Sequence, residues 1–510
     1  MRRDLFSVIF ITLKAIKFKM VQKIEDHFEV LEEGEYTLNL ASDLFSKGRV
    51  EFRNVEYLSE VINRIMRLAS GYQIVKIKLY GISSLKEAEN IDYIYDQLLL
   101  KTKLYMRILE NQEEQLYFYK MALKEIRNNE DLLASKTLSI VSTGTGNLSI
   151  GYYRDREIQY VHNFKNGIVK LIEIFSEVRD EAETLHHIIL ENYLKNTFDS
   201  VKKFMPFNVS EILVVSGREM KQLRERLGFE EKTIFEIEEL EELYFEYGSY
   251  KVEVLAEKLD VSESTAVGIL YTLALYKVVA ELTESKKIVI LETTIQDAIM
   301  ESKFFRKRDL NIENQVENSI LRAVKRLGRR YQYNEEHAVL VQDLSLKIYD
   351  ELQNLHAMGK KERFYLELAS LSHDMGKFVN LSEHQKYSHN ILMASDIIGL
   401  LRKEKQIVAN VVLHHGKQEK INFDGPTFRD FTASEKVMVA KLTAILKIAD
   451  SLEAGNAHLM KDTEFKLDGK ILYIFVKQRI EELMMIQLHF KKSHFFTDVF
   501  GIRVELKNRK

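Results

Sequence analysis

The sequence of 510 residues contains no cysteine. Disulfide bonds, thiol nucleophiles and thiolate zinc sites are therefore all excluded. Any metal ion that the chain binds must be held by histidine, aspartate and glutamate side chains, which suit Mg, Mn, Fe or Zn. A cytoplasmic location fits the absence of cysteine, and we expect it.

The chain also has little proline, and its N-terminal apolar run is short. Only Pro206 and Pro426 occur, so domain boundaries have to be inferred from changes in periodicity. Residues 1–18 contain two arginines and an apolar run that Lys14 and Lys17 interrupt, well before the ~20 residues of a membrane span. No small-residue cleavage site of a signal peptide follows. We interpret this segment as the opening β-strand and expect no membrane association.

A large excess of charge of one sign is absent as well. The formal net charge is −3, so we expect no global attraction to nucleic acid or to an anionic membrane. Residues 252–279 have the pattern of a helix-turn-helix, but the second helix lacks the Arg, Lys, Asn and Gln side chains that read base edges. We expect a pair of packing helices there, and no specific nucleic-acid partner. One basic cluster could track a polyanion or form a solvated helix face: Lys325, Arg326, Arg329 and Arg330.

Hydrophobic periodicity divides the chain into three parts. The N-terminal part follows the order β-β-β-α-β-α, and a similar order begins again at residue 136. Two successive copies of one α/β topology predict two related lobes with a cleft between them. From residue 311 the pattern becomes strongly helical, and alternating strands follow after residue 461. We predict an α/β lobe at 1–133, a second lobe with a helical extension at 134–305, and an all-α domain with a small terminal sheet at 311–510.

The helical part carries a pattern of histidine and aspartate residues that is typical of a metal site. His337 opens a predicted helix, His373 and Asp374 are adjacent at the end of another, and Asp450 lies late in a third. An adjacent His-Asp pair at a helix end can face one site, because the backbone changes direction there. Nitrogen and carboxylate ligands of this kind bind divalent metals, and a bound metal activates water and polarises a phosphoryl oxygen. We predict that these four residues converge on one divalent metal ion.

Other residues near this pattern are candidates for supporting roles. Lys377 follows Asp374 by three positions and could contact a phosphate from the same side. Three more histidines could hold a second ion or orient a substrate: His389, His414 and His415. Three others are interpreted as bystanders: His356, His384 and His458.

The order of these motifs, with LSHDMGK at 371–377 and LKIADSLEAG at 446–455, resembles the HD phosphohydrolase superfamily. Nearly the whole chain resembles the exopolyphosphatase/guanosine pentaphosphate phosphohydrolase (Ppx/GppA) family. That family has two actin-like (ribonuclease H-like) lobes followed by an HD-type helical domain. The resemblance implies a hydrolase of phosphoanhydrides that releases phosphate from polyphosphate or guanosine pentaphosphate. The resemblance is also compatible with a homodimer.

In this family, substrate phosphates lie between the lobes, where a glycine-rich loop of each lobe cradles them and carboxylates hold Mg. The first loop aligns with 12–16, where the acid and the glycine are lost, and the second with 142–149, where Ser142 and Ser149 replace carboxylates. Serine is a much weaker ligand for a hard metal. The resemblance assigns phosphate-binding roles to Lys86, Gly144, Thr145, Gly146, Asn147 and Gly217.

The general base of the family aligns with Glu114, in the pair Glu113-Glu114. A solvated glutamate at a helix start is the alternative interpretation. Three functions therefore stay open: a phosphohydrolase with a degenerate inter-lobe site, an HD-domain phosphohydrolase acting on a nucleotide, and a non-catalytic sensor of polyphosphate or nucleotide. The family favours the first, whereas the residues favour the second or the third. A metal bound at the His-Asp pattern would separate the second function from the third.

Overall fold

The structure is a computed structural model, and it forms two compact units, Met1–Ser319 (unit 1) and Ile320–Lys510 (unit 2). Helix α14 (Leu310–Arg330) contains the boundary between the units. The structure describes all residues except 1–3, 25–26, 144–147, 156, 165–166, 176–185, 203–209, 217, 228–233, 292–293, 305–309, 417–419, 454–462, 477–493 and 509–510.

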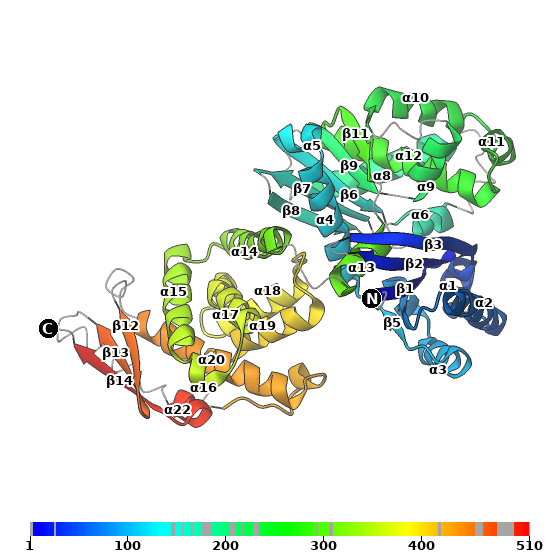
Figure 1. Cartoon of the computed structure of the whole chain (residues 1–510). Coiled ribbons are helices and arrows are strands. Elements are labelled where there is room, and N and C mark those ends of the chain that lie inside the picture. The colour runs from blue at the N-terminus through cyan, green and yellow to red at the C-terminus, as the bar shows by residue number, and fades with distance from the viewer. Residues whose placement is uncertain are drawn as a thin grey trace. The chain divides into compact units, whose positions relative to one another are not determined.

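Unit 1 begins with a five-stranded sheet whose strand order is β3-β2-β1-β4-β5 (Figure 1). The central strand β1 pairs antiparallel with β2 and parallel with β4. Its side chains are buried from Phe6 onward, as expected for an apolar strand covered on both faces. The strands are β1 (Asp4–Ile11), β2 (Ala15–Ile24), β3 (His27–Thr37), β4 (Lys76–Gly81) and β5 (Met106–Ile108).

The helices of this first lobe bury one apolar side each. In α2, buried residues recur every three or four positions, from Val55 to Ala69, which is the spacing of one helix face. The helical elements are α1 (Leu40–Lys47), α2 (Phe52–Gly71), the 3₁₀ helix η1 (Ser83–Glu87), α3 (Ile91–Thr102), α4 (Asn111–Asn128) and α5 (Glu130–Ala134).

The second sheet of unit 1 repeats the topology of the first. Its order is β10-β11-β9-β6-β7-β8, with β6 antiparallel to β7 and parallel to β9. The repeated α/β order in the sequence is therefore confirmed. The strands are β6 (Thr137–Thr143), β7 (Leu148–Arg154), β8 (Glu157–Phe164), β9 (Ile212–Ser216), β10 (Ile234–Glu236) and β11 (Lys287–Ile290). The helices are α6 (Ile168–Ile174), α8 (His186–Lys202), α9 (Arg218–Arg226), α10 (Ile237–Gly248), α11 (Val252–Leu259), α12 (Glu263–Thr283) and α13 (Ile295–Phe304).

Each lobe of unit 1 has its own hydrophobic core. Helix α13 follows the second sheet in the chain but packs against β1 and α4, and its residues Ala298, Ile299 and Met300 belong to the first core. An ion pair of 2.8 Å between Lys19 and Asp297 also joins α13 to the first sheet. The chain thus returns to the first lobe before it enters unit 2.

Helix α12 is the second helix of the pattern that suggested a helix-turn-helix, and it lies in the second core. A helix buried in this way cannot lie in a DNA groove, so the interpretation as a packing helix is confirmed. Within the described residues, α12 alone is long and apolar enough to cross a membrane, and 83% of its most apolar stretch is buried inside the protein.

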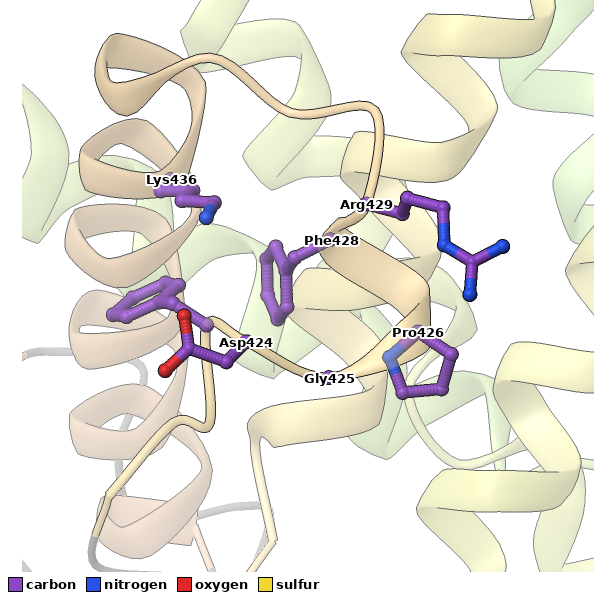
Figure 2. Close-up of a pocket in the computed structure, with 7 residues that line it drawn as sticks. Asp424, Gly425, Pro426, Phe428, Arg429 and Lys436 are labelled. Carbon is purple, nitrogen blue, oxygen red and sulfur yellow. The ribbon is translucent and has the colours of Figure 1, made fainter.

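Unit 2 is a helical bundle with a three-stranded sheet (Figure 1). Its central helices α15, α17, α19 and α20 pack against one another. The helices are α15 (Glu335–Glu351), α16 (Gln353–His356), α17 (Lys360–Ser372), η2 (Met375–Phe378), α18 (His384–Ala394), α19 (Arg402–His414), η3 (Pro426–Phe428), α20 (Ala433–Glu453) and α22 (His494–Phe500). The strands are β12 (Glu464–Asp468), β13 (Ile471–Val476) and β14 (Arg503–Asn508). The segment with η3, between α19 and α20, helps to line a pocket (Figure 2).

Candidate functional site

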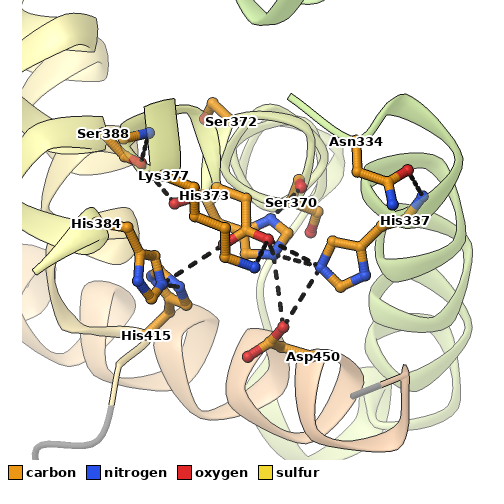
Figure 3. Close-up of polar contacts among 12 residues, drawn as sticks. Asn334, His337, Ser370, Ser372, His373, Lys377, His384, Ser388, His415 and Asp450 are labelled. Carbon is orange, nitrogen blue, oxygen red and sulfur yellow. Dashed lines mark hydrogen bonds and ion pairs between the residues drawn. The ribbon is translucent and has the colours of Figure 1, made fainter. Parts of the chain in front are cut away.

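The His-Asp pattern of unit 2 is brought together by the ends of three helices (Figure 3). His337 lies in the first turn of α15, whose N-terminus is capped by a hydrogen bond of 3.1 Å from the His337 N–H to the Asn334 side chain. His373 and Asp374 directly follow α17, and Asp450 lies in the last turns of α20. Because the three helices pack against one another, their ends present these side chains to one place.

The side-chain atoms of these four residues lie close enough to share one cation. The Nε2 atom of His337 lies 3.1 Å from Nε2 of His373, 3.1 Å from the Asp374 carboxylate and 3.6 Å from the Asp450 carboxylate. His373 Nε2 lies 3.5 Å from the Asp450 carboxylate. Potential ligand atoms of His337, His373 and Asp450 all lie within 4.8 Å of one another. The four side chains therefore lie together, as the sequence predicts.

Two further histidines extend the cluster, and one of them was not predicted. His415 forms a second group with His373 and Asp374 whose ligand atoms lie within 4.8 Å of one another. The Nε2 atom of His384 lies 3.2 Å from Nε2 of His415 and 3.5 Å from the Asp374 carboxylate. The interpretation of His384 as a bystander was wrong. His384 lies in the first turn of α18, as His337 lies in the first turn of α15, and this signal could have identified it. We name these six residues, His337, His373, Asp374, His384, His415 and Asp450, the His-Asp centre.

Three imidazole rings of the His-Asp centre are oriented in the same way. In each, Nδ1–H donates a hydrogen bond to the backbone carbonyl three residues earlier, so Nε2 faces the centre with a lone pair or a second proton. The pairs are His373 and Ser370 (2.7 Å), His384 and Leu381 (3.0 Å), and His415 and Val412 (2.6 Å). Carbonyl partners of this kind are typical of metal-binding histidines, because they fix the tautomer and the orientation of the ring.

Two of the histidines that we expected at the centre lie elsewhere. His389 sits in α18 with its Nδ1 atom 3.1 Å from the side-chain oxygen of Asn390, and burial lowers its pKa. The ring of His414 stacks on Phe428 with ring centres 5.5 Å apart. Adjacent residues at a helix end point about 100° apart, so His415 faces the centre and His414 does not. Of the described bystanders, His356 is buried and bonded to the backbone of Tyr349, and His458 lies outside the described residues.

The charges of the centre favour a bound cation. Burial lowers the pKa of His373, but the carboxylates of Asp374 and Asp450 outweigh burial and raise it to about 9. The pKa values of both carboxyl groups are held well below their usual range; burial opposes this, and His373 is the main lowering contact. Burial and the charge of His373 lower the pKa of His415 to about 4. Without a metal, two carboxylates therefore lie beside the protonated ring of His373.

Backbone contacts beside Asp374 hold the second half of the centre in place. The N–H of Gly376 donates to the hydroxyl of Ser388 (2.7 Å), and this hydroxyl donates to the carbonyl of His373 (2.6 Å). Ser388 belongs to α18, so these bonds join α18 to the end of α17. Lys377 pairs with the Asp374 carboxylate while nearly half of its side chain stays exposed. It lies at the rim of the centre, where it can meet an anion.

The first family loop of unit 1 forms a closed turn instead of a phosphate cradle. The Thr12 hydroxyl accepts the Ala15 N–H at 2.9 Å and closes a turn between β1 and β2. Leu13 is fully buried in the first core. The carbonyl oxygens of Leu13 and Lys14 accept N–H groups of Leu40 and Leu38. An apolar side chain and satisfied backbone groups thus occupy the turn in which the family has its acid and glycine.

The second family loop is described only at its ends. Gly144, Thr145, Gly146 and Asn147 lie outside the described residues, as does Gly217. The Ser149 hydroxyl is buried and lies 3.1 Å from the hydroxyl of Tyr119, whose pKa is raised by burial. A Cβ atom added at Gly151 would lie 2.6 Å from the same hydroxyl. Tyr119 therefore fills the space beside the position where the family has a carboxylate.

Glu114 is not a solvated glutamate. Its carboxylate accepts the backbone N–H of Ser83 at 2.5 Å, and burial raises its pKa to about 7. The neighbouring Glu113 is buried and binds Arg107 through two contacts of 2.8 and 3.0 Å. Lys86 is half exposed and lies 3.9 Å from Glu110.

The basic cluster of α14 is partly neutralised. Arg329 binds Glu335 through two contacts of 2.8 Å, both at exposed positions. Exposed pairs of this kind contribute little stability. This arrangement fits a solvated helix end, which was one of the two interpretations of the cluster.

Comparison with known proteins agrees with this architecture. Residues 321–494 match the family model described as Ppx/GppA phosphatase, domain III. An exopolyphosphatase from Cytophaga hutchinsonii shares the fold, with 12% identity over 59% of this chain and 97% of that chain and a TM-score of 0.50. A Ppx/GppA family member from Aquifex aeolicus has 14% identity over 59% of this chain and 97% of that chain, with a TM-score of 0.46. The curated protein sequences give no match. Residues 321–494 of the chain are thus similar to domain III of the Ppx/GppA phosphatases.

Proposed function

We propose that the chain is a metal-dependent phosphohydrolase whose reaction takes place at the His-Asp centre of unit 2. The observation that carries this proposal is the convergence of three histidines and two aspartates in two groups whose ligand atoms lie within 4.8 Å of one another, with His384 beside them. The similarity of residues 321–494 to a Ppx/GppA phosphatase domain supports phosphoryl chemistry. The filled turn at Leu13 and the contact between Tyr119 and Ser149 argue against the inter-lobe site of the family.

The donor set fits a divalent metal. His384 and His415 both use Nδ1–H for backbone carbonyls, so their Nε2 lone pairs face each other at 3.2 Å. Two lone pairs at this distance repel unless a proton or a metal lies between them. The Nε2 atoms of His337 and His373 lie 3.1 Å apart, so a metal ion could take the place of the proton that His373 carries. These two facing pairs, with the carboxylates beside them, offer positions for one or two ions, and Mn, Fe, Zn and Mg all accept such ligands.

A bound metal would supply an activated water and would polarise a phosphoryl oxygen. The residues of the chain would bind the phosphate and hold the ligand rings in place. Lys377, at the rim, attracts and orients a phosphate as a positive point charge. The carbonyl oxygens of Ser370 and Val412 hold His373 and His415 in a single ring orientation. Because the pKa of His415 is about 4, its Nε2 atom is unprotonated at neutral pH and its lone pair is available to hold a metal.

Polyphosphate and guanosine pentaphosphate are the substrates to test first, because they are the ones expected of the family. Phosphate release from each should be measured after chelation and after addition of Mg, Mn, Fe or Zn. We expect activity that needs the metal, is lost in His373→Ala/Asp374→Ala, and falls no more than about twofold in Glu114→Gln. Turnover that survives the double change in the His-Asp centre would refute the proposal.

Specific observations also support two other functions. A pKa of about 7 suits Glu114 to the role of general base at the inter-lobe site, and loss of turnover in Glu114→Gln alone would establish that function. A non-catalytic sensor would bind polyphosphate or nucleotide without releasing phosphate. The filled first turn favours the sensor over inter-lobe hydrolysis, and binding without turnover under every metal would establish it.

A further inference from the structure

The three-stranded sheet of unit 2 has one buried face and one face with exposed side chains (Figure 1). On the buried face, β12 packs against α15, and Leu472 and Ile474 of the central strand β13 are fully buried. Alternate residues of a strand point to opposite faces of the sheet. The other three residues of β13 therefore lie on the opposite side, where each is partly exposed: Ile471, Tyr473 and Phe475. We name this side the outer face.

Every outer-face position of the two edge strands carries a charge. Along β12 the signs are negative, positive and negative, and along β14 they are positive, negative and positive. All six side chains are exposed, namely Glu464, Lys466 and Asp468 in β12 and Arg503, Glu505 and Lys507 in β14. The strand register places one residue of each edge strand beside each outer-face residue of β13. Each row across the outer face thus has a charge of one sign at one end, an uncharged side chain in the middle and a charge of the other sign at the far end.

The opposite charges of one row are held apart by the central strand. Neighbouring strands lie about 4.8 Å apart, so β12 and β14 are separated by about 10 Å. Among the described residues, four of the six charged side chains make no ion pair: Lys466, Asp468, Arg503 and Glu505. The Lys507 ammonium group lies 3.7 Å from the centre of the Tyr473 ring, and such a contact is weak at an exposed position. These charges are therefore available to a partner molecule.

The order of the signs complements a second copy of the same face. Two sheets that pack face to face keep their strand directions within about 30° of each other. A two-fold axis along β13 brings β12 of one copy opposite β14 of the other, row by row. Every charge then faces a charge of opposite sign, in three pairs that each occur twice: Glu464 with the partner's Lys507, Lys466 with the partner's Glu505, and Asp468 with the partner's Arg503.

The same charges disfavour the reverse orientation. A two-fold axis across the strands would bring each strand opposite its own copy with the rows reversed. Glu464 would then face the partner's Asp468, and Arg503 would face the partner's Lys507. Like charges opposite each other in an interface are costly. We propose that the outer face is the interface of a homodimer, in which the β13 strands of the two copies run in the same direction.

The size of the outer face sets the expected strength of this dimer. Three strands about 4.8 Å apart, with six residues at about 3.3 Å each, cover roughly 300 Å² of sheet. A standard interface buries about 800 Å² per partner, so the contact should be weak and reversible. The charge pairs then determine the orientation of the copies more than their affinity. We expect association at high micromolar concentration that weakens as salt is added.

The experiment measures self-association of the full chain by sedimentation velocity over a range of protein concentrations. Lys466→Glu places two carboxylates opposite each other in the dimer, and Glu505→Lys places two ammonium groups opposite each other. Each change should weaken self-association about tenfold or more. Lys470→Glu is the control, because it reverses an exposed charge in the turn between β12 and β13, outside the outer face. This variant should associate as the wild type does.

Mixing the two variants tests the pairing directly. When a Lys466→Glu chain meets a Glu505→Lys chain, both central pairs again join opposite charges, so the equimolar mixture should associate as the wild type does. Recovery in the mixture also shows that both variants are folded. The double change Lys466→Glu/Glu505→Lys in one chain should restore self-association for the same reason.

Four results would overturn the proposal. A wild type that stays monomeric at every concentration would leave the outer face to a different partner. Association that Lys466→Glu does not weaken would place the contact on another surface. A mixture of the two variants that stays monomeric would show that residues 466 and 505 do not face each other. Equal loss in Lys470→Glu would mean that general repulsion between the chains, rather than the outer face, controls association.

Discussion

The Nε2 atom of His384 lies 3.2 Å from the Nε2 atom of His415, and both rings have already committed Nδ1–H to a backbone carbonyl. Neither Nε2 atom carries a proton in the neutral ring that these bonds select. The pair is therefore stable only when a proton or a metal ion is shared between them. Burial and the charge of His373 lower the pKa of His415 to about 4, so this ring is neutral at neutral pH and its Nε2 atom can bind a metal ion.

His384→Ala should consequently weaken metal binding. Removing one nitrogen ligand leaves the carboxylate of Asp374, 3.5 Å from His384, with fewer partners to complete the metal site. We expect the affinity for Mn or Zn to fall at least about tenfold, as measured by competition with a chelating dye. The control is His389→Ala, which removes a histidine from the same helix outside the centre. Equal loss in both variants would show that helix α18, rather than the ligand atom, had been damaged.

The double change His373→Ala/Asp374→Ala should abolish metal binding at the centre. These two residues occur together in one of the two candidate ligand groups, and His373 occurs in both. Metal content of purified protein, measured by mass spectrometry, should fall to background while circular dichroism retains the helical signal. A variant that keeps its metal would mean that the ion binds elsewhere in the chain.

Residues of the centre that lie at helix ends could be predicted from the sequence. His337, His373, Asp374 and Asp450 each lie near the end of a helix that periodicity reveals, so their convergence followed from packing these helices together. His384 and His389 are five residues apart in α18, which turns the second about 140° away from the first. The choice between them depends on where α18 begins, and the sequence does not define this start sharply enough.

Non-local packing explains what the sequence did not reveal in unit 1. The repeated strand order was readable because each strand is a local pattern. The contact of Tyr119 with Ser149 joins α4 to β7 across 30 residues, and α13 returns to the first core after the whole second sheet. The loss of a carboxylate at position 149 is visible in the sequence, but the tyrosine that fills the space is not.

Gly376→Ala should disturb the centre through the backbone. A Cβ atom at this position would lie 2.1 Å from the carbonyl oxygen of His384 and 2.5 Å from the backbone nitrogen of Ser388. Backbone atoms cannot rotate away as side chains do, so α18 must shift. We expect a loss of about 1–3 kcal/mol in stability together with weaker metal binding, measured by denaturation and by metal titration.

A matched control for this change exists in unit 1. Gly71 ends α2, and a Cβ atom added there meets no atom within 4 Å. Gly71→Ala should leave stability unchanged or raise it by up to about 1 kcal/mol, since alanine has the better helix propensity. If Gly376→Ala behaved in the same way, the tight approach of α18 to η2 would be refuted.

The pH dependence of stability should report the partly buried carboxyl group of Glu114. Burial raises its pKa from the ordinary value of 4.5 to about 7, so between these values the folded chain keeps a proton that the unfolded chain has lost. Stability due to this group is fully present below pH 4.5 and is lost as the pH rises through 7. The full effect is at most about 3 kcal/mol. Glu114→Gln cannot ionise, so it should gain stability over the wild type as the pH rises.

The measurement is the difference in thermal midpoint between Glu114→Gln and wild type at pH 5 and at pH 8. We expect this difference to move in favour of the variant at pH 8, because only the wild type then has to bury a charged carboxylate. Glu110→Gln provides the control, since it removes a carboxyl group from the start of the same helix α4 where a third of the side chain is exposed. It should show no comparable gain. A difference that is constant from pH 5 to pH 8 would mean that Glu114 is ionised throughout, and the carboxylate would then have a counter-charge close enough to offset its burial.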